Sequence, residues 1–363
     1  MNTKKNILIC PLEWGLGHAG RMIPLAGRLQ ELDHNIFFGA GDEHLTFLRK
    51  EFPGATYIEF PGFRISYSRY LPQYLTILLK SPVLVYHSVS EHFKLKKIIR
   101  DYSIDIVISD NRIGLWNKGL KSIFVSHQLR IRFPKPFRFL EFTGVLAIRW
   151  VIRKYTYCFV PDMEDEINLS GELSHGMKIP GNVRYIGILS RLWGSDLNHP
   201  AASSKHLIIL SGPEPQRSIF EQAIRKLFID HGLHAIILEG KPSQSVDKYS
   251  EGNIEVYSHP DMKTTRDLIL GCDRIICRGG YTTIMELISL GKSAILVPTF
   301  GQTEQEYLAE YLSGKGWFSF VPQKELGPKI FSAQKPDKLP AGIFNRSSAL
   351  LDAVLSEVLE DHH

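Results

Sequence analysis

The stretch CRGGYTTIMELISLGKSAILVPTFGQTEQEYLAEYL, residues 277–312, decides the fold. An apolar run of strand length ends at Cys277, and a turn at Gly279 and Gly280 separates it from a helical pattern. A second strand-like run, SAILVPT, follows at 293–299, and a second helical pattern comes after it. Strands that alternate with helices are typical of a parallel sheet with crossover helices, so this stretch predicts an α/β layered domain.

The same alternation extends outward over most of the chain. It begins at residue 6, stops at the polar segment SDLNHPAASSK (195–205) and restarts at residue 206. The sequence therefore predicts two α/β domains joined near residue 200, followed by a closing helix in SSALLDAVLSEVLE (347–360). The expected strands lie in 6–10, 35–38, 104–109 and 122–125, and then in 206–212, 234–240, 253–258, 273–280 and 293–299.

Composition excludes several classes of protein. The chain has 363 residues, of which 44% are hydrophobic and 22% charged, and this balance excludes a disordered chain and a disulfide-stapled miniprotein. The four cysteines are scattered without metal-ligand spacing, which predicts buried thiols in a reducing cytoplasm. We find no signal-peptide pattern and no apolar run long enough to span a bilayer. The net charge of +5 is too small to indicate nucleic-acid binding.

The positive charge is concentrated in residues 121–154. Eight lysines and arginines and one acid, Glu141, lie in this segment, so it carries +7 and the rest of the chain −2. Aromatic residues such as Phe139, Phe142 and Trp150 interleave with the basic ones. This composition suits a surface that rests on an anionic membrane, but it equally suits a solvated basic face over a buried helix.

The turn in residues 277–312 is a candidate anion site. Free backbone amides at the start of the helix after Gly280 could hold a diphosphate, with the hydroxyls of Thr282 and Thr283 nearby. Glu286, one turn into that helix, could accept hydrogen bonds from the two hydroxyls of a ribose. Gln305 and Glu306 suit the recognition of sugar hydroxyls. Each acid could equally be a solvated helix residue, and the residues alone leave both interpretations open.

Two further glycine turns follow predicted strands. In LSGPEPQR (210–217), Ser211, Gly212 and Gln216 could contact phosphate, although an ordinary strand-to-helix connection explains them as well. EWGLGHAGR (13–21) lacks the complete dinucleotide fingerprint.

His18 is the chemical candidate in EWGLGHAGR. It follows a strand, where open α/β sheets bind ligands, and its ordinary pKa suits a general base near neutral pH. A structural histidine is an equal alternative.

Together these residues resemble the glycosyltransferases of the GT-B fold. The similarity is to the family 28 group, which contains the lipid II N-acetylglucosaminyltransferase and the diacylglycerol glycosyltransferases. GLGHAGR (15–21) matches the glycine loop of that group, and residues 278–309 match its donor-site signature. The chain is most similar to an uncharacterised bacterial subgroup, through VSHQ (125–128), VPD (160–162) and LSGELSH (169–175).

The resemblance implies two Rossmann-like domains that face each other across a cleft. Residues 1–197 are expected to bind the acceptor and residues 198–345 the nucleotide-sugar donor, while residues 346–363 form a helix that packs back on the first domain. His18 is the implied catalytic base, in an acceptor-side loop with Gly15, Gly17 and Arg21. The implied donor-binding residues are Ser211, Gly212, Gln216, Arg278, Gly279, Gly280, Thr282, Glu286, Gln305 and Glu306.

The implied reaction moves a hexose or N-acetylhexosamine from a nucleotide-sugar to an acceptor hydroxyl. UDP is the favoured nucleotide and a lipid-linked sugar of cell-envelope glycan synthesis is the favoured acceptor. We expect inversion, no metal and no cofactor, and an enzyme in the cytoplasm that is peripheral on the inner face of the membrane through residues 121–154. Departures at Thr303, Ala309 and Pro24 prevent the donor sugar and acceptor from being copied across. A nucleotide-sugar epimerase of the same fold and a non-catalytic nucleotide-sugar binding protein stay open as alternatives.

Overall fold

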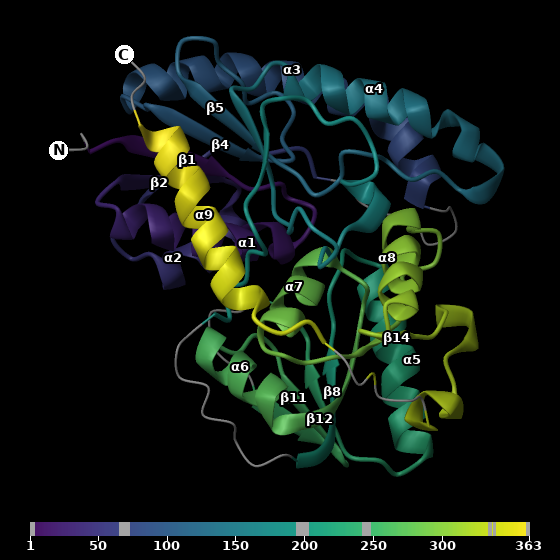
Figure 1. Ribbon diagram of the computed structural model, residues 1–363. Coiled ribbons are helices and arrows are strands. Elements are labelled where there is room, and N and C mark those ends of the chain that lie inside the picture. Colours follow the sequence, from purple (N-terminus) through teal and green to yellow (C-terminus); the bar gives the residue numbers. More distant parts are fainter. Residues whose placement is uncertain are drawn as a thin grey trace. The chain divides into compact units, whose positions relative to one another are not determined.

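Two compact units make up the chain in the computed structural model (Figure 1). The structure describes residues 4–64, 73–193, 203–241, 248–332, 336 and 339–360. Unit 1 is formed by Met1–Ile65, Ile77–Leu189 and Gly342–His363, and unit 2 by Ser66–Thr76 and Ser190–Ala341. Unit 1 therefore gives way to unit 2 at Ser190, whereas the predicted boundary follows residue 197, and the closing segment belongs to unit 1 from Gly342 on.

Unit 1 is built on a sheet whose strands have the order β3-β2-β1-β4-β5-β6-β7 over the described residues. Each pair of neighbours is parallel, as expected for strands joined by crossover helices. The central strands are apolar runs that are buried on both faces, as in NILIC and IVISD. The strands are β1 (Asn6–Cys10), β2 (Asn35–Ala40), β3 (Thr56–Glu59), β4 (Ile106–Asp110), β5 (Lys121–Val125), β6 (Tyr157–Val160) and β7 (Val183–Tyr185).

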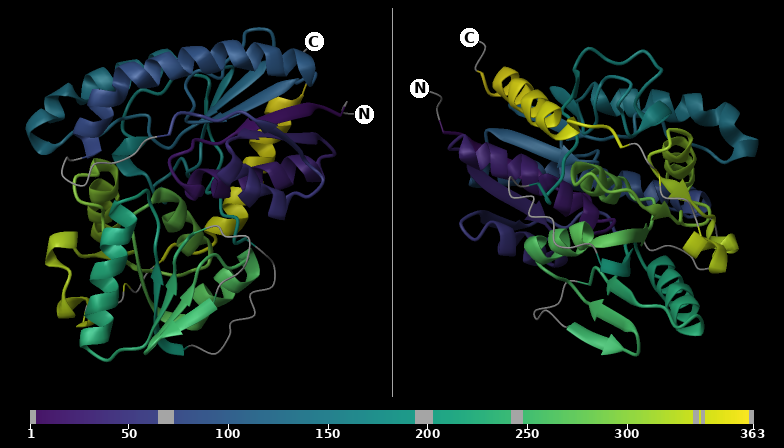
Figure 2. Two further views of the ribbon diagram at one scale, coloured as in Figure 1. Left: turned by 180° about the vertical axis from the view of Figure 1, so that it is seen from behind. Right: turned by 60° about the horizontal axis from the view of Figure 1, so that its bottom comes forward.

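Helices cover this sheet and include the carboxyl-terminal one. Helix α9 lies beside α1 in Figures 1 and 2, and Asp352 of α9 accepts a hydrogen bond from Arg28 of α1 at 2.6 Å. Arg184 of β7 pairs with Glu357 of α9 in the same way, at 2.7 Å. Helix α9 therefore packs on unit 1. The helices are α1 (Leu16–Glu31), α2 (Asp42–Glu51), α3 (Gln73–Asp101, in unit 1 from Ile77), η1 (Lys135–Leu140), α4 (Glu141–Ile152), η2 (Gly171–Leu173) and α9 (Ile343–Leu359).

Unit 2 repeats the architecture with the strand order β10-β11-β9-β8-β12-β13-β14 over the described residues. Neighbours are parallel except for the hairpin of β10 and β11 at the edge. The strands are β8 (Ser203–Ile209), β9 (Ala235–Leu238), β10 (Lys248–Glu251), β11 (Ile254–Tyr257), β12 (Cys272–Cys277), β13 (Ile295–Leu296) and β14 (Ser319–Phe320). The helices are α5 (Gln216–Asp230), α6 (Met262–Gly271), α7 (Tyr281–Ser289), α8 (Thr303–Gly314), η3 (Gln323–Glu325) and η4 (Pro328–Ser332).

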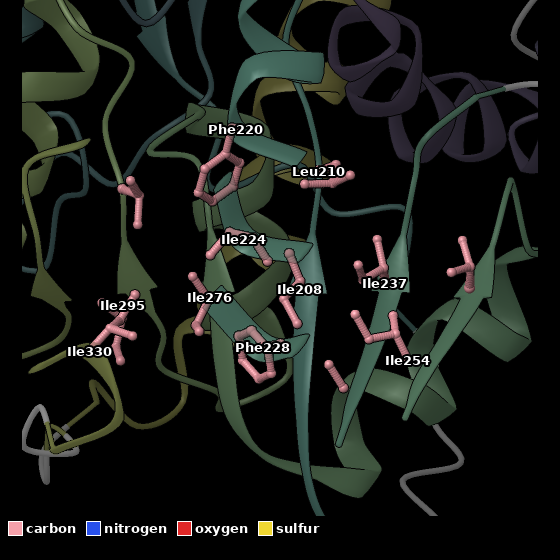
Figure 3. Packing of buried hydrophobic residues seen from close by; sticks show 13 residues of the cluster. Ile208, Leu210, Phe220, Ile224, Phe228, Ile237, Ile254, Ile276, Ile295 and Ile330 are labelled. Atoms are coloured by element: carbon pink, nitrogen blue, oxygen red, sulfur yellow. The ribbon is translucent and has the colours of Figure 1, made fainter. Parts of the chain in front are cut away.

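The core of unit 2 fixes α5 on its sheet (Figure 3). Phe220 and Phe228 of α5 are fully buried against Ile208 of β8 and Ile276 of β12. Burial of one such phenylalanine stabilises the fold by about 1.5–3 kcal/mol. The start of α5 is thereby held at the carboxyl end of β8.

The structure confirms the α/β class and every strand that the sequence predicts. It adds strands that the sequence analysis did not expect, namely β3, β6, β7, β10 and β14. All four cysteines, Cys10, Cys158, Cys272 and Cys277, lie among the described residues as buried free thiols, as predicted. Burial raises the pKa of Cys10 and of Cys277 to about 12, so these thiols are unreactive.

Candidate functional site

The strand order of each sheet reverses direction at one place. In unit 1 the chain builds outward from β1 to β3 and then continues from β4 on the other side of β1. In unit 2 the reversal lies between β8 and β12. Loops on the two sides of such a switch point diverge, and open α/β sheets bind ligands at the carboxyl ends of the strands there. Each unit therefore has one preferred position for a site.

At the switch point of unit 1, the loop after β1 places His18 in the first turn of α1. Gly15 precedes the helix with a φ of 122°, a conformation that an L side chain rarely adopts, so the turn needs glycine here. The imidazole of His18 is 20% exposed, and its Nδ1 lies 2.8 Å from Oδ2 of Asp110, the last residue of β4. The two loops of the switch point thus meet through a histidine and an aspartate.

The hydrogen bond to Asp110 determines how His18 can react. A carboxylate oxygen only accepts, so the contact with Asp110 is a hydrogen bond in the tautomer that carries its proton on Nδ1 of His18. In the other tautomer the same nitrogen accepts from Nη2 of Arg21, 2.9 Å away. A lone pair on Nδ1 would face the lone pairs of Asp110. In the tautomer paired with Asp110, Nε2 carries the lone pair of the neutral imidazole, and it can accept a proton from a hydroxyl.

Two buried residues complete this group, which we call the acid–base cluster: His18, Arg21, Asp110 and His127. Nε of Arg21 donates to Oδ2 of Asp110 at 3.1 Å, and its Nη2 donates to Oδ1. Nη1 of Arg21 donates to Nδ1 of His127, two residues beyond β5, at 3.3 Å. Of the four side chains only His18 has substantial exposure. Acid–base chemistry in this cluster therefore reaches the solvent through His18.

Burial and the neighbouring charges together shift the pKa values of His18 and Asp110. Burial, and next the charge of Arg21, lowers the pKa of His18, against the opposing effect of Asp110. Burial alone would raise the pKa of Asp110, but Arg21 and His18 hold it below its ordinary value. Asp110 is thus ionised and His18 neutral at pH 7, which is the state a general base requires.

Polar contacts beneath the glycine loop fix its shape. Glu13 accepts hydrogen bonds from the backbone amides of Gly41 at 2.6 Å and Gly62 at 2.9 Å, and it pairs with Arg64 at 2.7 Å. His44 of α2 donates from Nε2 to the carbonyl of Gly15 at 3.2 Å. Glu13 and His44 are buried, so they position the loop that holds His18. Gly17, which the sequence assigns to the same loop, is exposed.

At the switch point of unit 2, backbone groups take the place of charged side chains. Helix α7 begins after Gly280, and the first backbone amides of a helix point toward its amino terminus, where the helix dipole favours an anion. A Cβ added at Gly280 would lie 4.0 Å from Oγ of Ser211 in the loop after β8, so the two loops lie side by side. Gly212 has a φ of 95° and open space around it. Ser211 and Gly280 lie near each other here, and Gly212, Gly279 and Thr282 adjoin them in the sequence.

The structure places Arg278 beneath this loop. Its side chain is fully buried, and its guanidinium donates to Oε1 of Gln323 at 2.7 Å and to the carbonyl of Gln216 at 2.9 Å. It also lies 4.2 Å from the ring centre of Phe220. Burial lowers the pKa of Arg278 to about 10. Arg278 therefore joins the end of β12 to the first residue of α5, and the contacts of its guanidinium are within the protein.

Glu286 lies on α7 and is only 8% exposed. Its Oε1 accepts a hydrogen bond from Nε of Arg191 at 2.7 Å. Ser190, next to Arg191, receives a hydrogen bond from Ser289 at 2.7 Å. Sequence reasoning missed Arg191, because a single arginine after an apolar segment carries no motif. This contact uses one carboxylate oxygen of Glu286, and the carboxylate has a second oxygen that can accept from another donor.

Gln305 and Glu306 hold the loop after β13. Oε1 of Gln305 accepts from the amide of Thr299, and Oε1 of Glu306 accepts from the amide of Gly301, each at 2.9 Å. The loop between these contacts presents Phe300, which is 69% exposed. The two side chains that the sequence assigns to a sugar therefore also shape the loop beside them.

Comparison with known proteins adds to this geometry. Residues 217–340 match the Glycosyltransferase family 28 C-terminal domain. An uncharacterized glycosyltransferase of Methanosarcina acetivorans is 26% identical, over 84% of this chain and 82% of its own length. A UDP-N-acetylglucosamine--N-acetylmuramyl-(pentapeptide) pyrophosphoryl-undecaprenol N-acetylglucosamine transferase of Pseudomonas fluorescens is 28% identical, over 38% of this chain and 41% of its own. This chain is a glycosyltransferase.

The glycosyltransferase has the GT-B fold. The glycotransferase of kitacinnamycin superposes with a TM-score of 0.64 over 99% of this chain and 100% of its own, at 14% identity. SnogD of Streptomyces nogalater superposes with a TM-score of 0.61 over the same shares, also at 14% identity. The predicted fold and the predicted similarity to the family 28 group are therefore confirmed. Since the relative of Methanosarcina acetivorans is archaeal, a bacterial origin stays a prediction.

The family 28 match covers only part of the glycosyltransferase's two sites. It includes the turn at Gly279 and Gly280 and the loop held by Gln305, and it begins after Ser211 and Gly212. The acid–base cluster lies outside it. Within the described ranges, no group of three or more histidine, cysteine or acidic side chains could hold a metal ion, and no helix is long and apolar enough to cross a membrane.

Proposed function

We propose that this glycosyltransferase transfers a hexose or N-acetylhexosamine from a UDP-sugar to an acceptor hydroxyl, with inversion and without a metal. The observation that carries the proposal is the hydrogen bond from His18 to Asp110, 2.8 Å long, at the switch point of unit 1. In the tautomer that this bond requires, Nε2 of the partly exposed imidazole carries the lone pair and can act as a base for an acceptor hydroxyl.

The proposal assigns the donor to the switch point of unit 2. The amino terminus of α7, with its positive dipole end, and the hydroxyl of Ser211 suit a diphosphate, which carries negative charge and accepts hydrogen bonds. The second carboxylate oxygen of Glu286 suits a ribose hydroxyl. The Pseudomonas fluorescens relative is named for a UDP-sugar as its donor, which supports the choice of UDP.

The proposed reaction is a single displacement. The acceptor hydroxyl transfers its proton to Nε2 of His18 while its oxygen forms a bond to the anomeric carbon. The bond from that carbon to the phosphate oxygen breaks, and its electron pair leaves with UDP. Attack opposite to the leaving group inverts the anomeric centre. The amides at the start of α7 stabilise the charge that develops on the diphosphate, which is the task a metal performs in other enzymes.

The proposed acceptor is a lipid-linked sugar of the cell envelope, presented at the inner face of the cytoplasmic membrane. Helices α3 and α4 of unit 1 carry exposed apolar side chains at helical spacing, among them Leu79, Val83 and Tyr86 on α3 and Phe142, Leu146 and Trp150 on α4. Exposed basic residues lie on the same segments, with Lys94 and Lys97 on α3, Arg138 before α4 and Arg153 directly after it. An apolar stripe bordered by lysine and arginine suits the interface of an anionic bilayer.

Vesicle binding tests the membrane part of the proposal. We expect the protein to sediment with phosphatidylglycerol vesicles. The variant Phe142→Ser/Trp150→Ser should partition onto the vesicles at least tenfold more weakly, because the two serines bury less apolar surface in the bilayer. Ile229→Ser, at an exposed apolar residue of unit 2, is the matched control. Equal partitioning of the three proteins would contradict a membrane surface on α4.

Thermal unfolding tests the donor. We expect UDP and UDP-sugars, but not GDP, dTDP or CDP, to raise the melting temperature equally with and without EDTA. A ligand at about 100 times its Kd adds about 2.7 kcal/mol to the free energy of unfolding. Stabilisation that EDTA abolishes would contradict a metal-independent donor site. If only another nucleotide stabilises the protein, that nucleotide takes the place of UDP as the proposed donor.

A further inference from the structure

Arg21 and His18 share one carboxylate. Arg21 donates from Nε and Nη2 to the two oxygens of Asp110, and Nδ1 of His18 lies 2.8 Å from Oδ2. Nη2 of Arg21 also lies 2.9 Å from Nδ1 of His18. Asp110 is fully buried and Arg21 nearly so, which means that water contributes little to either charge.

This sharing decides whether His18 carries a proton. A buried carboxylate with no partner is costly, and a neighbouring histidine relieves the cost by staying protonated. In the acid–base cluster Arg21 already supplies that positive charge. A second positive charge on His18 would lie against the guanidinium of Arg21, and the low exposure of the site strengthens their repulsion.

We propose that Arg21 is a positioning residue that keeps His18 unprotonated, by satisfying the charge of Asp110 that would otherwise hold a second proton on the imidazole. The proposal rests on the proposed role of His18 as the base. It gives Arg21 a task beyond the support of a loop, because the residue acts on the reacting imidazole through Asp110.

The other ionisable groups that face His18 do not supply this charge. His127, after β5, accepts from Nη1 of Arg21 on its Nδ1, so it is part of what orients the guanidinium. His44 of α2 interacts electrostatically with His18 and lies under Gly15. Burial lowers the pKa of His44, so it is neutral at pH 7. Arg21 on α1 and Asp110 on β4 affect the pKa of His18 more strongly than His127 does.

The geometry requires an arginine at position 21. Its planar guanidinium places Nε and Nη2 against two carboxylate oxygens and Nη1 against His127. A lysine offers a single nitrogen, which can keep the charge near Asp110 but cannot reach all three atoms. We therefore expect Arg21→Lys to preserve the protonation state of His18 better than a neutral residue does, with a lower rate at all pH values.

The test is an NMR titration of the His18 imidazole, assigned with His18→Asn, in the wild type and in Arg21→Gln. Removal of the guanidinium should raise the midpoint by about one pH unit or more, because an unpaired carboxylate remains beside the ring. In Arg21→Gln/Asp110→Asn the midpoint should return to the wild-type value or fall below it. Arg28→Gln, on the same helix and paired with Asp352, is the matched control and should leave the midpoint unchanged.

Activity gives the second readout. A raised midpoint means that His18 is protonated up to a higher pH, so the acidic limb of kcat/KM should move to higher pH in Arg21→Gln, with a part of the rate recovered at alkaline pH. A merely structural role would lower the rate by one factor at all pH values and leave the limb in place.

The outcomes separate the inference from the proposed function. The inference is overturned if Arg21→Gln folds and its His18 imidazole titrates with the same midpoint as in the wild type. If Arg21→Gln does not fold, the double variant and Arg21→Lys still test it: a midpoint in the double variant well above the wild type, or one in Arg21→Lys raised by a full unit, overturns it. Full turnover in His18→Ala contradicts the proposed function while the titration still reports on Arg21.

Discussion

The two switch points of this glycosyltransferase occupy the same place in the same architecture and present different chemistry. In unit 1 the loops after β1 and β4 join through charged side chains, with His18 bound to Asp110 and Asp110 to Arg21. In unit 2 the loops after β8 and β12 approach through Ser211 and Gly280, at the amino terminus of helix α7. The buried cation beside them, Arg278, donates hydrogen bonds to a carbonyl oxygen and a side-chain amide oxygen of the protein.

The difference shows that the fold determines where a ligand lies and the loop residues determine what happens to it. A pair such as His18 and Asp110 can move a proton. A row of amides at the start of a helix can hold an anion but cannot change its protonation. The comparison therefore predicts that substitutions in unit 1 change turnover and substitutions in unit 2 change donor affinity.

The largest effect is expected for His18→Ala. Without the imidazole the acceptor proton has no base, so kcat should fall by about 10²–10⁴. The Kd for UDP, measured by calorimetry, should stay within about twofold, because the donor is assigned to unit 2. If His18→Ala lost UDP binding together with turnover, the result would contradict the assignment of the base to unit 1 and the donor to unit 2.

Gly280→Val tests the donor side in the same way. Gly280 has an ordinary φ of −72°, and among the described residues its added Cβ has no neighbour closer than Oγ of Ser211 at 4.0 Å, so the fold tolerates a side chain. The side chain would occupy the space over the amides of α7, and UDP should bind at least tenfold more weakly with the melting temperature unchanged. Gly314→Ala, at a helical glycine with open space around it, is the control for stability and should leave the Kd alone.

Glu286→Gln sharpens the assignment of the ribose. A carboxylate accepts from a hydroxyl more strongly than an amide does, so the variant should lose about tenfold in affinity for UDP. It should lose less for 2′-deoxy-UDP, which lacks one of the hydroxyls. Glu310→Gln, at an exposed acid of α8, is the control. If Glu286→Gln lost affinity equally for the two nucleotides, Glu286 would not be the residue that binds the ribose.

The smallest effect is expected for the wild type between pH 7 and pH 8. Burial and Arg21 hold the pKa of His18 below its ordinary value of 6.5, so the imidazole is largely neutral at pH 7. Raising the pH to 8 should therefore increase kcat/KM by less than about 1.5-fold, while the acidic limb of the rate should lie below the ordinary histidine value of 6.5. A rate that rises tenfold between pH 7 and 8 would show that the base is not His18 in this state.

The sequence predicts the fold where its signal is local. The central strands are long apolar runs between helical patterns, and each one is found. The missed strands are short or lie toward the edges, such as β7 with three residues and β14 with two, and runs of that length carry no periodic signal. They form because a neighbouring strand already offers hydrogen-bonding groups.

The candidate sites divide in the same way. Glycine turns and His18 can be found from the sequence, because they follow predicted strands. Asp110 cannot, since a single aspartate after an apolar run has no signature until β4 is known to lie beside β1. The burial of Arg278 is equally hidden, because it depends on the side chain facing Phe220 and α5.

Hydrogen–deuterium exchange with and without UDP tests the division between the two switch points most directly, because one experiment reports on both. We predict slower exchange on UDP binding at the amides of residues 211–217 and 279–284, and unchanged exchange at residues 14–21 and 110–113. Protection confined to residues 14–21 and 110–113 would place the nucleotide in unit 1 and contradict the assignment of the donor to unit 2.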